Sequence, residues 1–442
     1  MTMPQRSPRA AGVGWWIVWW IGVAIIPVSG IIVVTAAKTC TGFFPVGPLP
    51  DHGCMSPVTA IVWGLWLLSF ACMVIPLPRF DRVPLRTVVI VQIVAGIAFV
   101  LTPTEPTADV YAYHVYGAVG PNWDPWHPTV LVSNREAIVT GLRLWHNPPM
   151  PSPYGPVLVW YEHALLAAFP NFTADQLIYV ERCISLAVAV FVTLLLRGPR
   201  IAMWALHPLV LYEFALAAHC DILMLGLIAL AIRLRNPILA GVAIALAGMV
   251  KIVGLGAILF RPAAIASAIA TVAVVALVDR QFITPKALYG AVYGFNGSPG
   301  LVIAVLMKLV FHVQQPDAVV RALVVGAAIV CALTFRVQRR DAAAYAVLLL
   351  VAASSWIVPW YLTWPVFAAR YAHRVTTIAV SVIAAASMLT EAHAQVHAPA
   401  TLILGTLAFL TVWALALGWA WRNGPAPRFV FRKPSVAARE AV

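Results

Sequence analysis

Residues 204–232 read WALHPLVLYEFALAAHCDILMLGLIALAI. This stretch is apolar enough to lie in a membrane, yet it places His219 and Asp221 side by side with Cys220. A charged side chain at the centre of a membrane helix costs about 2.5–3.5 kcal/mol on insertion scales, so such residues usually face a cavity. The stretch therefore predicts two short helices that meet at a polar break, because broken helices are tolerated where they line protein or a water-filled cavity.

The rest of the chain has the same apolar character. Of its 442 residues, 62% are hydrophobic and only 10% are charged, and the mean hydropathy is +0.88. Apolar runs of about 17–25 residues recur from end to end, and within lipid only helices satisfy every backbone group of such runs. We predict an all-α polytopic membrane protein with about 11–14 transmembrane segments. The first apolar run starts at Gly14 and is not followed by a cleavage site, so we expect it to remain as an anchor.

About fourteen apolar segments can be traced, and several are too short to cross a bilayer alone. Their approximate bounds are 14–37, 57–77, 86–103, 174–196, 201–217, 221–234, 237–250, 252–260, 262–278, 318–336, 342–358, 360–370, 375–391 and 399–421.

The net charge of +13 would suggest an anionic partner in a soluble protein. Here the basic residues gather in short loops at segment ends, such as Arg79 with Arg82 and Arg197 with Arg200, and in the tail 422–442. The positive-inside rule assigns these loops and both termini to the cytoplasm. We therefore expect a multi-pass protein of the plasma (inner) membrane, in contact with membrane lipids and without a nucleic-acid partner.

The same topology puts residues 38–56, 104–173 and 279–317 on the extracytoplasmic side. Residues 104–173 are dense in Trp, Tyr, His, Pro and acidic groups, which either stack on sugar rings or form an interfacial aromatic belt. Residues 156–170 are interpreted as a surface helix rather than a span. Cys40 and Cys54 share the first outer loop, where an oxidising compartment would allow a disulfide.

Several ionisable residues fall in or next to apolar segments, and all of them lie toward the predicted outer face. They are Asp109, Arg182, His219, Asp221, Lys251 and Arg321. Two interpretations stay open at this point. The residues form a functional site, or Glu213, Asp221 and Lys251 form an ion-pair set that tethers short helices.

A series of motifs resembles a known family. In chain order these are DVYAY (109–113), DPW (124–126), WHNPPMPSPYGP (145–156), Arg182, the stretch from Trp204 to Leu227, Lys251, FNGS (295–298) and PWYLTWP (359–365). Together they resemble the actinobacterial polyprenol-phosphate-mannose-dependent α-(1→6)-mannosyltransferases of lipoglycan synthesis, which are GT-C membrane glycosyltransferases. The resemblance covers roughly residues 85–370. The chain departs from the family pattern at His207, at Cys220 and at Asp124-Pro125-Trp126, which leaves the acceptor and the donor sugar open.

The resemblance implies a GT-C fold and an inverting transfer of mannose from a polyprenyl phosphate to a lipid-linked glycan at the outer face. No Gly-rich phosphate loop or Rossmann pattern occurs, in keeping with a lipid-linked rather than a nucleotide donor. Such a transfer needs a carboxylate base, groups that hold the leaving phosphate and a groove for the prenyl tail.

We expect Asp109 to be the base, with Asp221 as its rival. Lys251, His219, Arg182 and, more weakly, Arg321 are the candidates for the donor phosphate, because Lys and Arg form charge-assisted hydrogen bonds with phosphate. Aromatic residues are expected to shape the sugar and acceptor pocket, and these are Tyr111, Tyr113, Tyr154, Trp360 and Tyr361.

We expect no cofactor. Asp109, Asp124 and Asp221 could gather around a hard divalent cation, but their spacing matches no dedicated metal loop. Two alternative functions remain. A pentosyl (arabinofuranosyl) transferase would use the same geometry with another donor, and a secondary transporter would also have short broken helices, although the halves of this chain show no convincing similarity to each other.

Overall fold

The computed structural model describes residues 12–39, 52–81, 83–103, 109–120, 133–144, 154–198, 200–278, 341–352, 358–389 and 399–424, with a few single positions between 307 and 329. Every regular element within these residues is a helix. The predicted all-α fold class is thereby confirmed.

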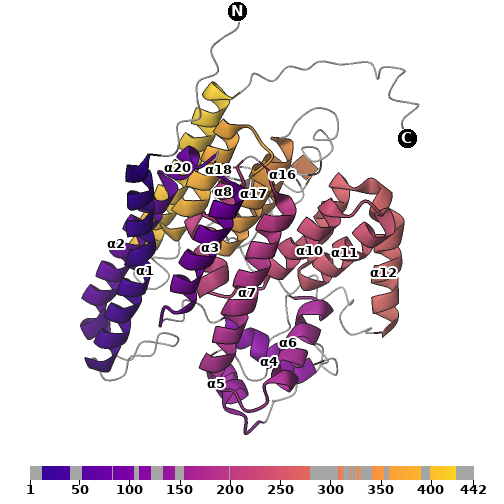
Figure 1. The fold of residues 1–442 in the computed structure, drawn as a ribbon, viewed down its shortest axis with the longest axis horizontal. Helices are drawn as coiled ribbons and strands as arrows, with labels where there is room; N and C mark the ends of the chain where they lie inside the picture. The colour runs from indigo at the N-terminus through magenta and orange to yellow at the C-terminus, as the bar shows by residue number, and fades with distance from the viewer. Residues whose placement is uncertain are drawn as a thin grey trace, which may run out of the picture.

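Three long helices form the N-terminal part: α1 (Val13–Thr39), α2 (His52–Val74) and α3 (Leu85–Val100). Helices α1 and α2 pack along each other, as Figure 1 shows in indigo and violet. Trp19 of α1 is fully buried, and its indole nitrogen donates a hydrogen bond to the carbonyl of Leu206. This contact fixes the N-terminal pair to the centre of the protein.

Three short helices lie together at one end: α4 (Asp109–Val119), α5 (Glu136–Leu144) and α6 (Pro156–Ala168). Helix α7 (Ala174–Leu196) starts beside them and runs toward the opposite end (Figure 1). A capping box of Thr173 and Gln176 starts α7 by satisfying backbone N–H groups that have no partner within the helix. Helix α6 spans only 13 residues, roughly 20 Å, and is too short to cross a bilayer alone.

The apolar stretch 204–232 is broken, as predicted. Helices α8 (Ile201–Ala205) and α9 (Pro208–Leu211) lead into η3 (Tyr212–Leu216), a π-helical turn, and α10 (Asp221–Arg233) then leaves at an angle of 115° to the segment Pro208–Leu216. Ala218 has a positive φ of 54° at the bend. The bend exposes the ends of two helices to the same site, since His219 lies in the turn and Asp221 begins α10.

Helices α10, α11 (Pro237–Val250) and α12 (Ile265–Val278) pack side by side (Figure 1). Asn236 caps α11 by accepting hydrogen bonds from the N–H groups of Ile238 and Leu239. The 3-10 helices η4 (Ile252–Phe260) and η5 (Pro262–Ala264) connect α11 to α12. The predicted segment 252–260 is therefore a 3-10 connection rather than an α-helical span.

The C-terminal part contributes α16 (Ala342–Ala352), η7 (Pro359–Leu362), α17 (Thr363–Ala369), α18 (Arg374–Ala386) and α20 (Pro399–Asn423). Helix α17 packs against α16 and α18, and α18 packs against α20. Through η7 and α17 this part reaches the centre of the molecule, where Trp364 and Phe367 join the main hydrophobic core.

Among the described residues, three helical segments are long and apolar enough to cross a membrane, namely Val13–Val33, Ile61–Arg79 and Ala174–Leu196. The bent pair of Pro208–Leu216 with Asp221–Arg233 would add a fourth. Shorter apolar helices accompany them. The protein is thus a helical membrane protein, while the expected number of 11–14 segments stays a prediction.

The basic loops meet at one end of the molecule. Arg374 pairs with Asp81 at 3.1 Å and donates a hydrogen bond to the carbonyl of Pro78, and Arg200 donates to the carbonyl of Ala372. In Figure 1, α1 begins and α20 ends at this end, opposite α4–α6. The basic loops therefore lie opposite the region predicted to be catalytic, and the assignment of the two ends to the two membrane faces stays a prediction.

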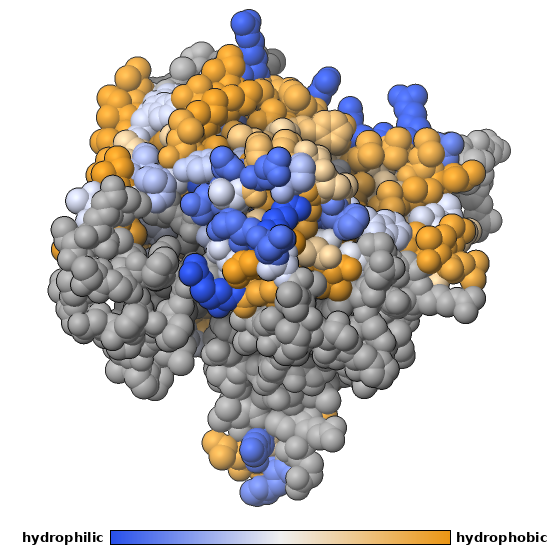
Figure 2. Space-filling model, turned by 90° about the horizontal axis from the view of Figure 1, so that it is seen from below, coloured by the Kyte–Doolittle hydropathy of each residue, from blue (hydrophilic) through white to orange (hydrophobic). Residues whose placement is uncertain are grey.

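The end that carries α4–α6 has a polar centre. Figure 2 looks onto this end: hydrophilic residues gather near the middle of its described surface, and hydrophobic residues flank them.

The predicted disulfide cannot be placed, because Cys40 lies outside the described residues.

Packing of α11 against α12 depends on the absence of a side chain at Gly241. A Cβ atom there would lie 1.9 Å from Ser267 Oγ and 2.5 Å from the carbonyl of Ala264. Small residues allow membrane helices to approach closely. We predict that Gly241→Leu lowers the apparent melting temperature in detergent, at a cost of about 1–3 kcal/mol as for other overpacked positions.

Gly64→Leu is the matched control, because nothing lies within 4 Å of a Cβ atom at Gly64. An equal melting temperature for the two variants would contradict the close approach of α11 and α12.

Candidate active site

The first half of the site surrounds Asp109, the first residue of α4. Its Oδ2 atom lies 3.9 Å from His219 Nδ1 and accepts a hydrogen bond from the Tyr154 hydroxyl at 3.3 Å. The Tyr113 hydroxyl, one turn along α4 from Asp109, lies 3.3 Å from the same histidine nitrogen. The Asp109 side chain keeps 18% of its surface exposed, whereas His219 is fully buried. Asp109 is therefore the group of this cluster that an incoming molecule can reach.

His219 is held from its other side by Glu213. Its Nε2 atom lies 3.3 Å from Glu213 Oε2, and its backbone N–H donates to the carbonyl of Glu213. Trp360 stacks on the imidazole with ring centroids 4.0 Å apart. These contacts fix the orientation of the ring in the bend between η3 and α10.

The second half of the site is a buried ion pair. Lys251, which follows α11, places Nζ 3.2 Å from both carboxylate oxygens of Asp221 at the start of α10. The Trp364 indole of α17 donates a 2.7 Å hydrogen bond to Asp221 Oδ1. Asp221 is completely buried and Lys251 nearly so. The consecutive helices α10 and α11 are thereby joined at one point to α17, which is distant in sequence.

Aromatic rings connect the two halves. Lys251 Nζ lies 4.2 Å from the ring centroid of Tyr361 and 5.6 Å from that of Tyr154, and the Tyr154 ring meets Tyr113 edge to face at 5.1 Å. Ammonium groups are attracted to aromatic faces within about 6 Å of the ring centroid. Tyr154 thus touches both halves, since its hydroxyl bonds Asp109 while its ring faces Lys251.

Gly155 allows the chain after Tyr154 to pack directly against the end of α11. Its N–H donates to the carbonyl of Val250, and a Cβ atom at this position would lie only 2.2 Å from the carbonyl oxygen of Met249. The peptide after Tyr154 therefore rests directly on the end of α11, next to Lys251. Pro156 then starts α6, as proline often does at the first helical position.

An apolar cavity of about 290 Å³ adjoins the ion pair. It lies between α10, α11 with η4, α16 and α17, and its lining includes Ile228, Val347, Phe367 and Trp364. The lining is mostly apolar and also includes Arg261 and Arg370. Trp364 also bonds Asp221, so its side chain contacts both the cavity and the ion pair.

Burial raises the pKa of Asp109 from 3.8 to about 6, and the nearby Asp221 adds to this effect, while Lys251 and the Tyr154 hydroxyl oppose it. A carboxylate with a pKa near the working pH suits general base catalysis, because enough of it is ionised and it still binds a proton well.

Most of the predicted site residues meet here: Asp109, His219, Asp221, Lys251, Tyr113, Tyr154, Trp360 and Tyr361. Arg182 has a different setting, since its guanidinium donates to the backbone carbonyls of Leu216, Val100 and Thr102 and so ties α7 to α3 and η3. Tyr111 is buried and meets His114 edge to face at 6.4 Å. Arg321 and Asp124 lie outside the described residues.

Two residues of the site were not among those predicted. Trp364 is part of the motif PWYLTWP, but nothing in the sequence indicates that its indole reaches Asp221 across 143 positions. The sequence indicates Glu213 only as a member of an ion-pair set with Asp221 and Lys251. In the structure Asp221 and Lys251 form that pair, and Glu213 faces His219 instead.

A helical membrane scaffold thus places a carboxylate of raised pKa and a buried lysine near an apolar cavity. The family model described as alpha-(1->6)-mannopyranosyltransferase, N-terminal domain, matches residues 18–268, which is more than half of the chain. The chain belongs to this mannosyltransferase family. Among curated proteins and solved structures, no match is found.

The matched region contains Asp109, Tyr154, His219, Asp221 and Lys251. Trp360, Tyr361 and Trp364 lie beyond its end, so the segment 358–369 completes the site from outside the matched domain.

The roles of the ion pair can be separated by mutation. Removal of one partner of a buried pair leaves an uncompensated charge and costs about 3–5 kcal/mol. We predict that Lys251→Met strongly lowers the apparent melting temperature in detergent, and that the double variant Lys251→Met/Asp221→Asn regains much of the loss because no unpaired charge remains.

Both variants should be inactive in sugar transfer, because Lys251 is expected to contact the donor phosphate. If the double variant regained both stability and transfer, the ion pair would serve only to hold the helices together.

Proposed function

We propose that the protein transfers mannose from a polyprenyl-phosphate donor to a hydroxyl group of a lipid-linked glycan at the extracytoplasmic membrane face, with inversion at the anomeric carbon. The observation that carries the proposal is the contact between the charged cluster and the apolar cavity through Trp364. A donor with a hydrocarbon tail and an anionic head group needs these two environments side by side.

Lys251 holds the phosphate in this proposal. The lysine ammonium has three hydrogens, so it can keep a bond to Asp221 and still donate to a phosphate oxygen. Negative charge grows on that phosphate as the glycosidic bond breaks, and a cation fixed in a buried site stabilises it more than water would. The pair with Asp221 keeps Lys251 in place before the donor arrives.

Asp109 acts as the base. Its partly exposed carboxylate accepts the proton of the acceptor hydroxyl while that oxygen attacks the anomeric carbon, on the side opposite the leaving phosphate. The Tyr154 hydroxyl orients the carboxylate through its hydrogen bond to the Oδ2 atom. Asp221 is less suited to this role, because it is fully buried and bonded to Lys251 and Trp364.

The aromatic side chains form the sugar pocket. Tyr113 and Trp360 contact His219, Tyr154 contacts Asp109, and Tyr361 faces Lys251. Their rings and hydroxyl groups can pack on a sugar and bond its hydroxyls. Family membership favours mannose over a pentose as the transferred sugar, and favours an enzyme over a transporter.

The proposed role of Asp109 is tested by transfer of labelled mannose from polyprenyl-phosphomannose to an acceptor glycolipid in membranes. We predict that Asp109→Asn lowers the rate by about 10²–10⁴-fold, the usual contribution of general acid–base catalysis. Its matched control is Asp175→Asn, since Asp175 is an exposed carboxylate in the first turn of α7. With equal protein levels, transfer by Asp109→Asn at the wild-type rate would remove Asp109 from the base role.

The raised pKa of Asp109 also predicts the pH dependence of transfer. Only the ionised carboxylate accepts a proton, so kcat/KM should be steady above pH 6 and fall below it, by about tenfold per pH unit. An ordinary exposed aspartate would give this fall only near pH 4. A rate that stays constant between pH 7 and about pH 5 would contradict a base with the pKa of Asp109.

A further inference from the structure

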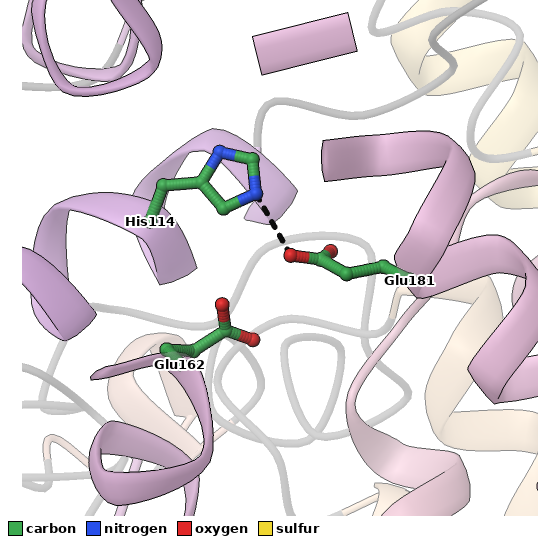
Figure 3. A group of neighbouring side chains, drawn as sticks. All are labelled: His114, Glu162 and Glu181. Carbon is green, nitrogen blue, oxygen red and sulfur yellow. Dashed lines mark hydrogen bonds and ion pairs between the residues drawn. The ribbon is translucent and has the colours of Figure 1, made fainter. Parts of the chain in front are cut away.

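A second buried cluster lies on another face of α4, apart from the residues that the transfer reaction uses. It consists of His114 from α4, Glu162 from α6 and Glu181 from α7. Figure 3 shows these side chains pointing toward one another from three helices. His114 Nε2 lies 2.8 Å from Glu181 Oε1, and one ligand atom from each residue lies within 4.8 Å of the other two.

Burial makes this cluster costly unless something balances its charge. His114, Glu162 and Glu181 are 0%, 1% and 3% exposed, and buried carboxylates need a partner charge or a proton. One oxygen of each glutamate, Oε2, is buried without a hydrogen-bond partner, as is His114 Nδ1. The cluster therefore has acceptor atoms to spare.

Close packing holds the three residues in place. A Cβ atom at Gly117 would lie 2.6 Å from Glu162 Cβ, so α4 and α6 touch at this level. His163, the next residue of α6, bonds the carbonyl of Gly117 through Nδ1 at 3.0 Å. The donor atoms are thus brought together by the fold itself and not by long flexible side chains at a surface.

One imidazole nitrogen and two carboxylate oxygens are a ligand set that zinc accepts. Tetrahedral coordination at about 2.0–2.2 Å would set the donor atoms roughly 3.4 Å apart, which small side-chain movements achieve from the present arrangement. A divalent ion would also neutralise the two carboxylates.

We propose that His114, Glu162 and Glu181 bind a divalent transition metal ion, with zinc as the best match, as a structural centre. The ion joins α4, which begins with the base Asp109, to α6, which begins next to Tyr154, and to the long helix α7. It would hold these short helices in register without contact to the sugar or its phosphate. The proposal does not depend on the identity of the donor or acceptor.

The test is zinc content of the full chain, expressed in metal-depleted medium, purified in detergent, incubated with ZnCl₂ and freed of unbound metal. Elemental analysis should find about one zinc ion per chain in the wild type and almost none in the double variant His114→Ala/Glu162→Gln. The control His373→Ala/Asp175→Asn removes an exposed histidine and an exposed carboxylate that lie outside the cluster, and it should retain about one ion.

A second measurement covers the case in which the double variant fails to fold. Zinc should raise the apparent melting temperature of the wild type and of the control, because a ligand that binds only the folded state stabilises it, and the single variant Glu162→Gln should lose most of this shift. Wild-type protein that binds no zinc above a detergent blank would overturn the proposal. So would a double variant that binds as much zinc as the wild type.

Discussion

The buried ion pair between Asp221 and Lys251 is the constraint on which the centre of this protein depends. Neither charge can stay in an apolar interior alone, so the start of α10 and the end of α11 must meet, and Trp364 brings α17 to the same point. To allow this contact, the backbone bends by 115° before α10. The bend ends one helix early enough for His219 and Asp221 to face a common space rather than lipid.

The same arrangement separates two environments over a short distance. On one side of Trp364 lie charged and hydroxyl groups, and on the other lies a cavity with a mostly apolar lining. Asp109 stands at the more exposed edge of the polar side. A lipid-linked sugar can therefore approach with its tail in the cavity, its phosphate near Lys251 and its sugar toward Asp109, while the acceptor arrives from the opposite direction.

Much of the fold could be predicted from the sequence because burial in lipid restricts the chain to helices, and because polar residues mark where helices end. Asn236 and Pro237 mark the start of α11, and His219 with Asp221 marks the bend. The prediction was less accurate where an apolar run does not form an α-helix: residues 252–260 are apolar throughout, yet glycines 254 and 256 accompany a 3-10 helix. Hydropathy alone does not distinguish these two conformations.

Residue types also predicted which charged side chains gather, but not how they pair. Arg182 looks like a phosphate ligand in sequence, yet its guanidinium is surrounded by the carbonyls where α3 and η3 end. The pairing of Glu213 with His219 and the indole bond of Trp364 depend on tertiary packing, which no local spacing encodes. The sequence does not predict the cluster of His114, Glu162 and Glu181 for the same reason, since its members come from three separate helices.

The central claim is that one polyprenyl-phosphate sugar occupies both the charged cluster and the apolar cavity. An experimental structure of the protein with a bound polyprenyl-phosphomannose analogue tests this most directly. The account predicts that the phosphate contacts Lys251, that the first isoprene units follow Trp364 into the cavity, and that the anomeric carbon faces Asp109. A donor bound elsewhere, with Asp109 remote from its sugar, would contradict it.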